Sequence, residues 1–326
     1  MIFLVILVVI FSFIAFLFVG RAPQQEQIIW GINFSEKHTA NFNLNWQEVY
    51  LALFDDLGTR HIKLAVHWDM IEPQKDAYYF DNLDWQIKEA EKRQAEILLV
   101  IGMKTPRWPE CHLPQWAKEL DKEAQQERIL KMLEQIVLRY KDSPAITMWQ
   151  VENEPFFPFG ECPWSDTNFL KEEIALVKSL DHLNRPVVIS DTGEMSLWIR
   201  AARLGDKVGT TLYKKVWFHE LKTYVNYPFP AVFYYRKAKL IDILFNKEVI
   251  CVELQAEPWG PQLLYDSPLD EQEKIMNLQQ LKDNIAFAEK TGLRKFYLWG
   301  AEWWYWMKHI HHQPEIWQEA QKLFLN

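Results

Sequence analysis

Two glutamates at the ends of apolar runs are the first candidates for chemistry. The segment WQVENEP places Glu154 just after one apolar run, and the segment VICVELQAEP places Glu253 at the end of another, with Glu257 four residues on. Cleavage of a glycosidic bond commonly uses two carboxyl groups. One protonates the leaving oxygen, and the other attacks the anomeric carbon or activates water. The sequence predicts this chemistry if the fold brings two of these carboxylates together.

The elements that must position them alternate along the chain. Short apolar runs rich in β-branched and aromatic residues are typical of strands buried on both faces of a parallel sheet. Eight such runs occupy residues 28–34, 61–68, 96–103, 145–151, 186–190, 208–213, 248–254 and 295–300. Helical stretches with charged faces are predicted at residues 45–58, 82–94, 121–141, 167–183, 194–205, 231–246, 270–292 and 314–325.

Eight strand–helix units in series predict an α/β fold, a single (β/α)8 barrel over residues 28–326. A doubly wound open sheet is the rival, but that fold usually has a Gly-rich loop after its first strand, and here SEKHTANFN follows. In a barrel the active site lies at the carboxyl ends of the strands. Polar or aromatic residues follow the predicted strands at His67, Trp68, Lys104, Trp108, Asn153, Glu154, Asp191, Glu194, Tyr213, Glu253, Glu257, Trp299 and Glu302.

The two carboxylate motifs resemble those of the retaining glycoside hydrolases of clan A, which are (β/α)8 barrels. In that clan an Asn-Glu pair ends strand four and a glutamate ends strand seven. The resemblance implies that Glu154 is the acid/base, that Asn153 binds the sugar 2-hydroxyl and that Glu253 is the nucleophile. It also implies that Tyr213 hydrogen-bonds the nucleophile and that Trp299 forms the floor of the sugar site.

Further segments extend the resemblance over most of residues 28–302. HIKLAVHWDMIEP is similar to the second-strand signature of the clan, with Trp68 as its tryptophan and His67 as an approximate counterpart of its arginine or histidine. Glu257 is the competing nucleophile, or else it binds a hydroxyl group. Glu302 begins the aromatic run EWWYW, which either lines the cleft or covers a loop. The motifs look nearer to family 42 β-galactosidases, whereas the short barrel looks like family 5.

The composition limits the classes of molecule that this protein is expected to bind. The formal net charge is −8 and no basic stripe is visible, which argues against nucleic acid. The 16 tryptophans favour a carbohydrate partner, because indole rings stack on the apolar faces of sugars, although many of them belong in a core. HIHH at 309–312 lacks recognisable zinc spacing. We therefore expect neither a metal nor a cofactor.

The N-terminal segment and the cysteines give information on the cellular location of the protein. Residues 1–20 are uncharged and apolar, which predicts a transmembrane anchor in preference to a cleaved signal, followed by a linker at 21–27. This predicts a membrane-anchored protein whose catalytic domain is extracytoplasmic. Cys111 and Cys162 lie in Pro-rich loops and form either a disulfide or two free thiols. Cys251 lies in an apolar strand and is expected to be buried.

Together these observations predict a retaining glycoside hydrolase that acts on a β-linked oligo- or polysaccharide by double displacement. The same machinery could transfer the glycosyl group to a second sugar. Two competing hypotheses are a barrel that binds carbohydrate without cleaving it and a membrane-bound scaffold. A barrel that only binds should lack one of the two carboxylates, and this chain has both.

Overall fold

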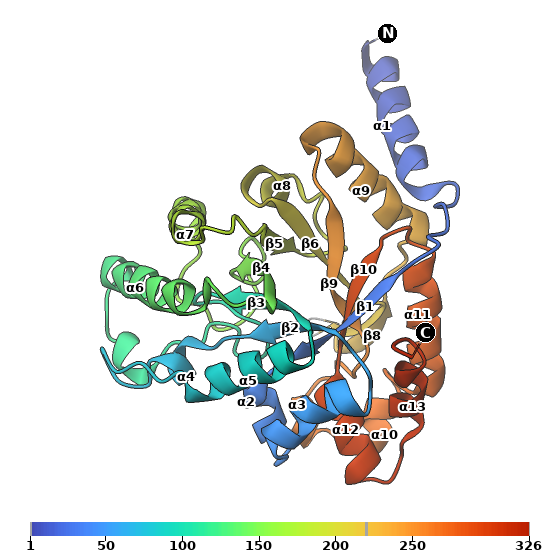
Figure 1. The fold of residues 1–326 in the computed structure, drawn as a ribbon. Helices are drawn as coiled ribbons and strands as arrows, with labels where there is room; N and C mark the ends of the chain where they lie inside the picture. The colour runs from blue at the N-terminus through green and yellow to red at the C-terminus, as the bar shows by residue number, and fades with distance from the viewer. Residues whose placement is uncertain (1, 219–220, 326) are drawn as a thin grey trace.

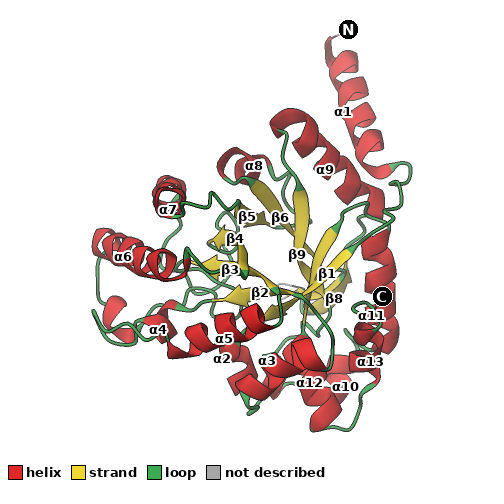
Figure 2. Cartoon of the chain, viewed as in Figure 1, coloured by secondary structure: helices red, strands yellow, loops and turns green. Residues whose placement is uncertain are grey.

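The computed structural model describes residues 2–218 and 221–325. Eight parallel strands form a closed barrel in the order β1-β10-β9-β6-β5-β4-β3-β2 (Figures 1 and 2). The barrel strands are β1 (Ile29–Phe34), β2 (His61–Ala65), β3 (Glu96–Ile101), β4 (Ile146–Val151), β5 (Val187–Asp191), β6 (Lys207–Leu212), β9 (Val249–Gln255) and β10 (Lys295–Trp299). All eight coincide with a predicted strand, so the expected (β/α)8 barrel is confirmed.

Helices surround this barrel, as Figure 2 shows in red. The longer ones are α3 (Trp46–Asp55), α5 (Asp81–Lys92), α6 (Lys122–Tyr140), α7 (Thr167–Leu180), α9 (Ala231–Phe245), α11 (Leu278–Glu289) and α12 (Ala301–His309). The shorter ones are α2 (Glu36–Asn41), α4 (Trp68–Ile71), α8 (Ile199–Leu204), α10 (Leu269–Glu273) and α13 (Glu315–Gln321), with 3-10 turns at Gln115–Ala117 and Leu264–Asp266.

Side chains at the helix starts explain where several helices begin. Asn45, Asp121, Asp166 and Asn277 each precede a helix, and the side-chain oxygen of each accepts a hydrogen bond from a backbone N–H of the first turn. Such caps satisfy donors that have no partner inside the helix. The cap at Asn277 also explains why the stretch predicted as one helix, 270–292, forms two helices, α10 and α11.

Two features of the fold were not predicted. After β6 the chain forms an antiparallel hairpin of β7 (Lys215–Phe218) and β8 (Thr223–Asn226), outside the barrel sheet. The aromatic run EWWYW belongs to helix α12, whose Trp303 and Trp304 are buried. These side chains pack in the core and do not line a cleft.

The N-terminal helix α1 (Ile2–Phe18) requires a correction. It has 17 residues, and at about 1.5 Å per residue it is about 26 Å long, less than the roughly 30 Å of a bilayer core. Within the part of the chain that the structure describes, no helix has the length and apolarity that a membrane crossing requires. The predicted transmembrane anchor, and the membrane-anchored location inferred from it, are therefore wrong.

The C-terminal end of α1 packs against the barrel domain. Leu17 is buried in the main core, and the ring of Phe18 contacts Phe229 and Phe233, with centroid distances of 6.1 and 5.2 Å. In Figure 1 the rest of α1 extends away from the barrel beside α9. Helix α1 is thus attached to the domain through its last turn.

Candidate active site

Glu253 lies in the barrel with both carboxylate oxygens engaged. It is near the end of β9 and is 4% exposed. Lys63 of β2 donates from Nζ to Oε1 at 2.9 Å, and the Tyr213 hydroxyl, just after β6, donates to Oε2 at 3.0 Å. Burial raises the pKa of Tyr213 well above its ordinary value, and the negative charge of Glu253 adds to this, so the phenol remains a donor. A buried carboxylate is tolerated where such partners are present.

Glu154 occupies the turn that follows β4 and is partly buried. Its backbone N–H donates to Ser190 Oγ at 2.8 Å, and its Oε1 accepts a hydrogen bond from Thr211 Oγ1 at 3.3 Å. Burial raises the pKa of Glu154 well above 4.5, and repulsion by the charges of Glu253 and Glu110 raises it further. Glu154 therefore holds its proton more tightly than an ordinary glutamate does, and it lies beside a carboxylate, Glu253, that has two donors.

Asn153 lies beside these carboxylates and is 2% exposed. Its Oδ1 accepts from Gln150 Nε2 at 3.1 Å, and its Nδ2 donates to Glu110 Oε2 at 3.1 Å. Glu110 is also buried. Burial raises the pKa of Glu110 to about 7 against the opposing charge of Lys104, and Glu253 adds repulsion. The site thus contains a third carboxyl group.

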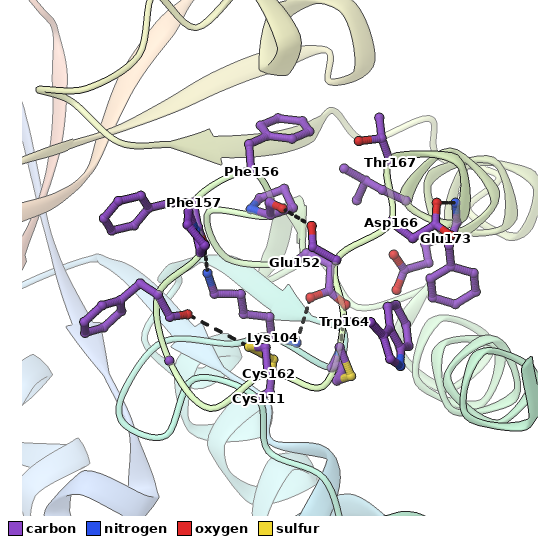
Figure 3. A pocket seen from close by; sticks show the side chains of 18 residues that line it. Lys104, Cys111, Glu152, Phe156, Phe157, Cys162, Trp164, Asp166, Thr167 and Glu173 are labelled. Atoms are coloured by element: carbon purple, nitrogen blue, oxygen red, sulfur yellow. Dashed lines mark hydrogen bonds between the residues drawn. A yellow bond between two sulfur atoms is a disulfide. The ribbon is translucent and has the colours of Figure 1, made fainter. Parts of the chain in front are cut away.

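Glu152 connects the loop after β3 to the turn after β4. Its two oxygens accept the backbone N–H groups of Met103 and Lys104, each at 2.7 Å. Figure 3 shows it beside a cavity of about 240 Å³ under the loop that follows β4, where Glu173 of α7 also lies. Burial raises the pKa of both carboxyls; the interaction between them opposes this rise at Glu152 and adds to it at Glu173. Glu152 thereby fixes the loop after β3 against the turn that holds Glu154.

Trp299 ends β10, and a cation covers its ring. The guanidinium carbon of Arg107 lies 3.9 Å from the ring centroid. Arg107 is held by an ion pair with Glu257 and by another with Glu302 at 2.9 Å. Although burial acts to raise it, the pKa of Glu257 is lowered to about 2 by Arg107 and His38. Glu257 and Glu302 therefore hold Arg107 in place and are not free carboxylates.

His67 and Trp68 are not open to a substrate. His67 is 2% exposed, and its ring nitrogens contact Ser35 Oγ at 3.0 Å and Thr105 Oγ1 at 2.9 Å. Burial lowers its pKa well below 6.5, so the ring is neutral. Trp68 is fully buried and donates from Nε1 to Glu72 at 2.9 Å. The structure places both residues in the packing around the site.

A disulfide ties together two loops at this end of the barrel. Cys111, in the loop after β3, is bonded to Cys162, in the loop after β4. Between the loops, Lys104 Nζ donates to the carbonyl oxygens of Glu154 at 3.1 Å and Phe157 at 2.8 Å. The loop that contains Arg107 and Glu110 is therefore attached directly to the loop that contains Glu154.

One group of described residues has the composition of a metal site. His38, Glu257 and Glu302 are buried, and each offers one ligand atom within 4.8 Å of the others. The Arg107 guanidinium already pairs with both carboxylates, and His38 Nε2 lies 3.6 Å from Glu257 Oε2. The positive charge that balances these carboxylates is thus supplied by a side chain of the protein.

Sequence reasoning missed three charged residues of the site: Lys63, Arg107 and Glu110. Lys63 had a readable signal, because it is a lone charge in the apolar run HIKLAVHW, and a buried charge needs a partner. Arg107 and Glu110 lie in an irregular loop, where both have positive φ angles of 89° and 72°. The position of a side chain in such a loop cannot be predicted from hydrophobic periodicity.

Comparison with known proteins gives structural matches only. No protein-family model matches the chain, and no curated protein matches it. A β-galactosidase from the Antarctic haloarchaeon Halorubrum lacusprofundi matches with 14% identity and a TM-score of 0.56, over 83% of this chain and 52% of that one. The chain thus spans about half the length of that enzyme.

Two shorter enzymes are covered more fully. An endo-β-1,4-xylanase of glycoside hydrolase family 10 from Gloeophyllum trabeum matches with 14% identity and a TM-score of 0.58, over 92% of this chain and 97% of that one. A family 5, subfamily 18 enzyme from Bifidobacterium longum matches with 12% identity and a TM-score of 0.58, over 84% and 70%. At these identities the comparison shows a shared fold. That fold is the one expected from the resemblance to clan A.

Proposed function

We propose that this protein is a retaining glycoside hydrolase of clan A that cleaves β-linked oligo- or polysaccharides, with Glu154 as acid/base and Glu253 as nucleophile. The observation that carries the proposal is the contrast between these two carboxyls. Glu253 is paired with Lys63 and hydrogen-bonded by Tyr213, whereas Glu154 has a strongly raised pKa, in part because Glu253 is close by. A neighbouring acid and carboxylate are what double displacement requires.

In the first step protonated Glu154 gives its proton to the leaving oxygen while Glu253 attacks the anomeric carbon. The C–O bond to the leaving group breaks and an ester bond to Glu253 forms. The ester has no negative charge, so the repulsion that raises the pKa of Glu154 is removed. Glu154, now ionised, can take a proton from water, whose oxygen attacks the anomeric carbon and releases Glu253.

The same arrangement supports Glu253, rather than Glu257, as the proposed nucleophile. Glu257 is bound to Arg107, and the contact between that guanidinium and Trp299 keeps the group together. Lys63 and Tyr213 each donate to one oxygen of Glu253 and so hold its carboxylate in one orientation. The family 5 match to a complex with Manb1-4GlcNAc supports a β-linked carbohydrate substrate. Transfer to a second sugar remains the alternative outcome of the same intermediate.

The test uses a panel of aryl β-glycosides with a good leaving group and compares the full chain with Glu154→Gln and Glu253→Gln. An activated leaving group needs little protonation, so Glu154→Gln should keep much of the first step, whereas Glu253→Gln should lose at least about 10³-fold in kcat/KM. Glu257→Gln is the matched control. If Glu257→Gln is inactive and Glu253→Gln is active, Glu257 is the nucleophile.

The pH dependence follows from the raised pKa of Glu154. The protonated acid is the active form, so kcat/KM on a substrate with a poor leaving group should fall as pH rises through that pKa. Glu154→Gln cannot lose a proton, and its remaining activity should lack this alkaline limb. An alkaline limb that persists unchanged in Glu154→Gln would assign the acid to another group. A wild type that cleaves no member of the panel and no β-linked polysaccharide would overturn the proposed function.

A further inference from the structure

We propose that Glu110 is a positioning residue: it orients Asn153, the residue that the family resemblance assigns to the sugar 2-hydroxyl, and it accepts a hydrogen bond from that same hydroxyl. This inference rests on the proposed function, since it concerns the sugar bound at Glu253. It assigns a role to a third carboxyl group that the two-glutamate mechanism does not use.

Glu110 lies within the charged centre of the site. It is 6% exposed, and its Oε2 accepts the hydrogen bond from Asn153 Nδ2 at 3.1 Å. The negative charge of Glu110 contributes to the raised pKa of Glu154. Glu110 also interacts electrostatically with Glu253 and Lys63. A carboxyl group in this position is close to both the acid/base and the nucleophile. It therefore lies beside the place where the anomeric carbon must sit.

The hydrogen bonds around Asn153 fix which way its amide points. Gln150 Nε2 donates to the backbone oxygen of Glu152 at 3.2 Å, and a carbonyl oxygen can only accept, so Gln150 presents its NH2 group. The same NH2 donates to Asn153 Oδ1 at 3.1 Å. Asn153 therefore turns its own NH2 toward Glu110. That NH2 has two hydrogens, and Glu110 accepts one of them.

A hydroxyl group is complementary to this pair. It can accept the second N–H of Asn153 and donate its own hydrogen to the Glu110 carboxylate. An analogue without that hydroxyl satisfies neither group and leaves buried polar atoms unpaired, which is the arrangement that gives strong discrimination. The structure thus assigns the selection of this hydroxyl to Asn153 and Glu110 acting together.

Hydrogen bonds and a disulfide restrain the loop that contains Glu110. Its backbone N–H donates to Arg107 O at 2.7 Å, and its carbonyl oxygen accepts from Thr105 N at 2.9 Å. The next residue, Cys111, is bonded to Cys162. On the other side, a Cβ atom added at Gly160 would lie 2.5 Å from Glu110 Cβ, so the two loops are in direct contact there. The Glu110 side chain therefore has little freedom to leave Asn153.

The experiment compares wild type, Glu110→Gln and Glu110→Ala on matched aryl β-glycosides with a 2-hydroxyl and without it. Glu161→Gln, an exposed carboxylate in the facing loop, is the control and should match the wild type. Because buried polar groups are left without a partner, both Glu110 variants should lose about 10- to 100-fold in kcat/KM on the 2-hydroxy substrate. On the 2-deoxy substrate they should stay within about threefold of the wild type, because the hydroxyl that Glu110 acts on is missing.

Using the ratio between the two substrates within each variant cancels the different intrinsic reactivity of 2-deoxy glycosides and any partial loss of folded protein. If both substrates lose activity by the same factor, Glu110 has only a structural role and the inference is overturned. The inference also fails if neither substrate is affected. In both cases the wild type is active, so the proposed function stands. A wild type inactive on every glycoside overturns the proposed function and this inference with it.

Discussion

Lys63 shows how one residue links stability to the proposed chemistry. Its side chain is 1% exposed and that of Glu253 5%, so each charge depends on the other. Removing one partner of a buried pair leaves an uncompensated charge, whereas removing both is much less costly. The residue that would prepare the nucleophile is thus also one on which the folded state depends.

We predict that Lys63→Met lowers the free energy of unfolding by about 3–5 kcal/mol. The double variant Lys63→Met/Glu253→Gln should recover a large part of this loss, because no unpaired charge remains. Urea unfolding followed by circular dichroism measures both. Lys178→Met is the control, since its ion pair with Asp206 is half-exposed and is worth at most about 1 kcal/mol. A loss in Lys63→Met no larger than in the control would contradict the prediction.

At the scale of elements, the site depends on the close approach of the loops after β3 and β4. Gly102 follows β3 with a φ angle of +135°, and a Cβ added there would lie 2.3 Å from Glu152 Oε1. The Glu152 carboxylate needs this space in order to accept the N–H groups of Met103 and Lys104. A glycine at this position thus allows the two loops to form their contact.

Gly102→Ala should therefore lose at least about 2 kcal/mol of unfolding free energy, from backbone strain and displacement of Glu152. It should also lower the activity proposed for Glu154, whose backbone is part of the same contact. Gly260→Ala is the matched control. Its added Cβ would meet its nearest neighbour, Ile275 Cδ1, at 3.4 Å, and we expect a change within about 0.5 kcal/mol. Thermal and urea unfolding of the two variants decide the matter, and equal stabilities would show that the loops tolerate the added methyl group.

At the scale of the whole molecule, helix α1 contributes to the barrel domain through its last turn. Leu17 is 5% exposed and belongs to the main core, whereas Phe11, nearly two turns earlier, is 74% exposed. The two residues therefore allow the packed and the unpacked parts of α1 to be compared within one helix.

Replacing Leu17 with alanine should lower the free energy of unfolding by about 2–3 kcal/mol, because a buried side chain leaves a cavity. Phe11→Ala should change it by less than about 0.5 kcal/mol. Both values come from denaturant titrations of the full chain. Equal effects of the two substitutions would mean that the last turn of α1 does not pack against the core in solution.

Much of the architecture could be read from the sequence. The eight apolar runs predicted the eight barrel strands, because a strand buried on both faces must be apolar along its whole length. The order of strands and helices then placed Glu154 and Glu253 at one end of the barrel, since parallel strands all end on the same side. The separation of the two motifs by about a hundred residues was no obstacle to this inference.

Only the tertiary structure decided which charges meet. The pairing of Arg107 with Glu257 and Glu302, and of Glu110 with Asn153, depends on an irregular loop with left-handed backbone positions that no periodicity encodes. The same is true of His67, whose hydrogen bonds to Ser35 and Thr105 come from two other loops. The sequence likewise did not show that α1 ends at Phe18 or that its last turn packs against the barrel domain. An apolar composition predicts burial, but the partner that provides it is set by three-dimensional contact.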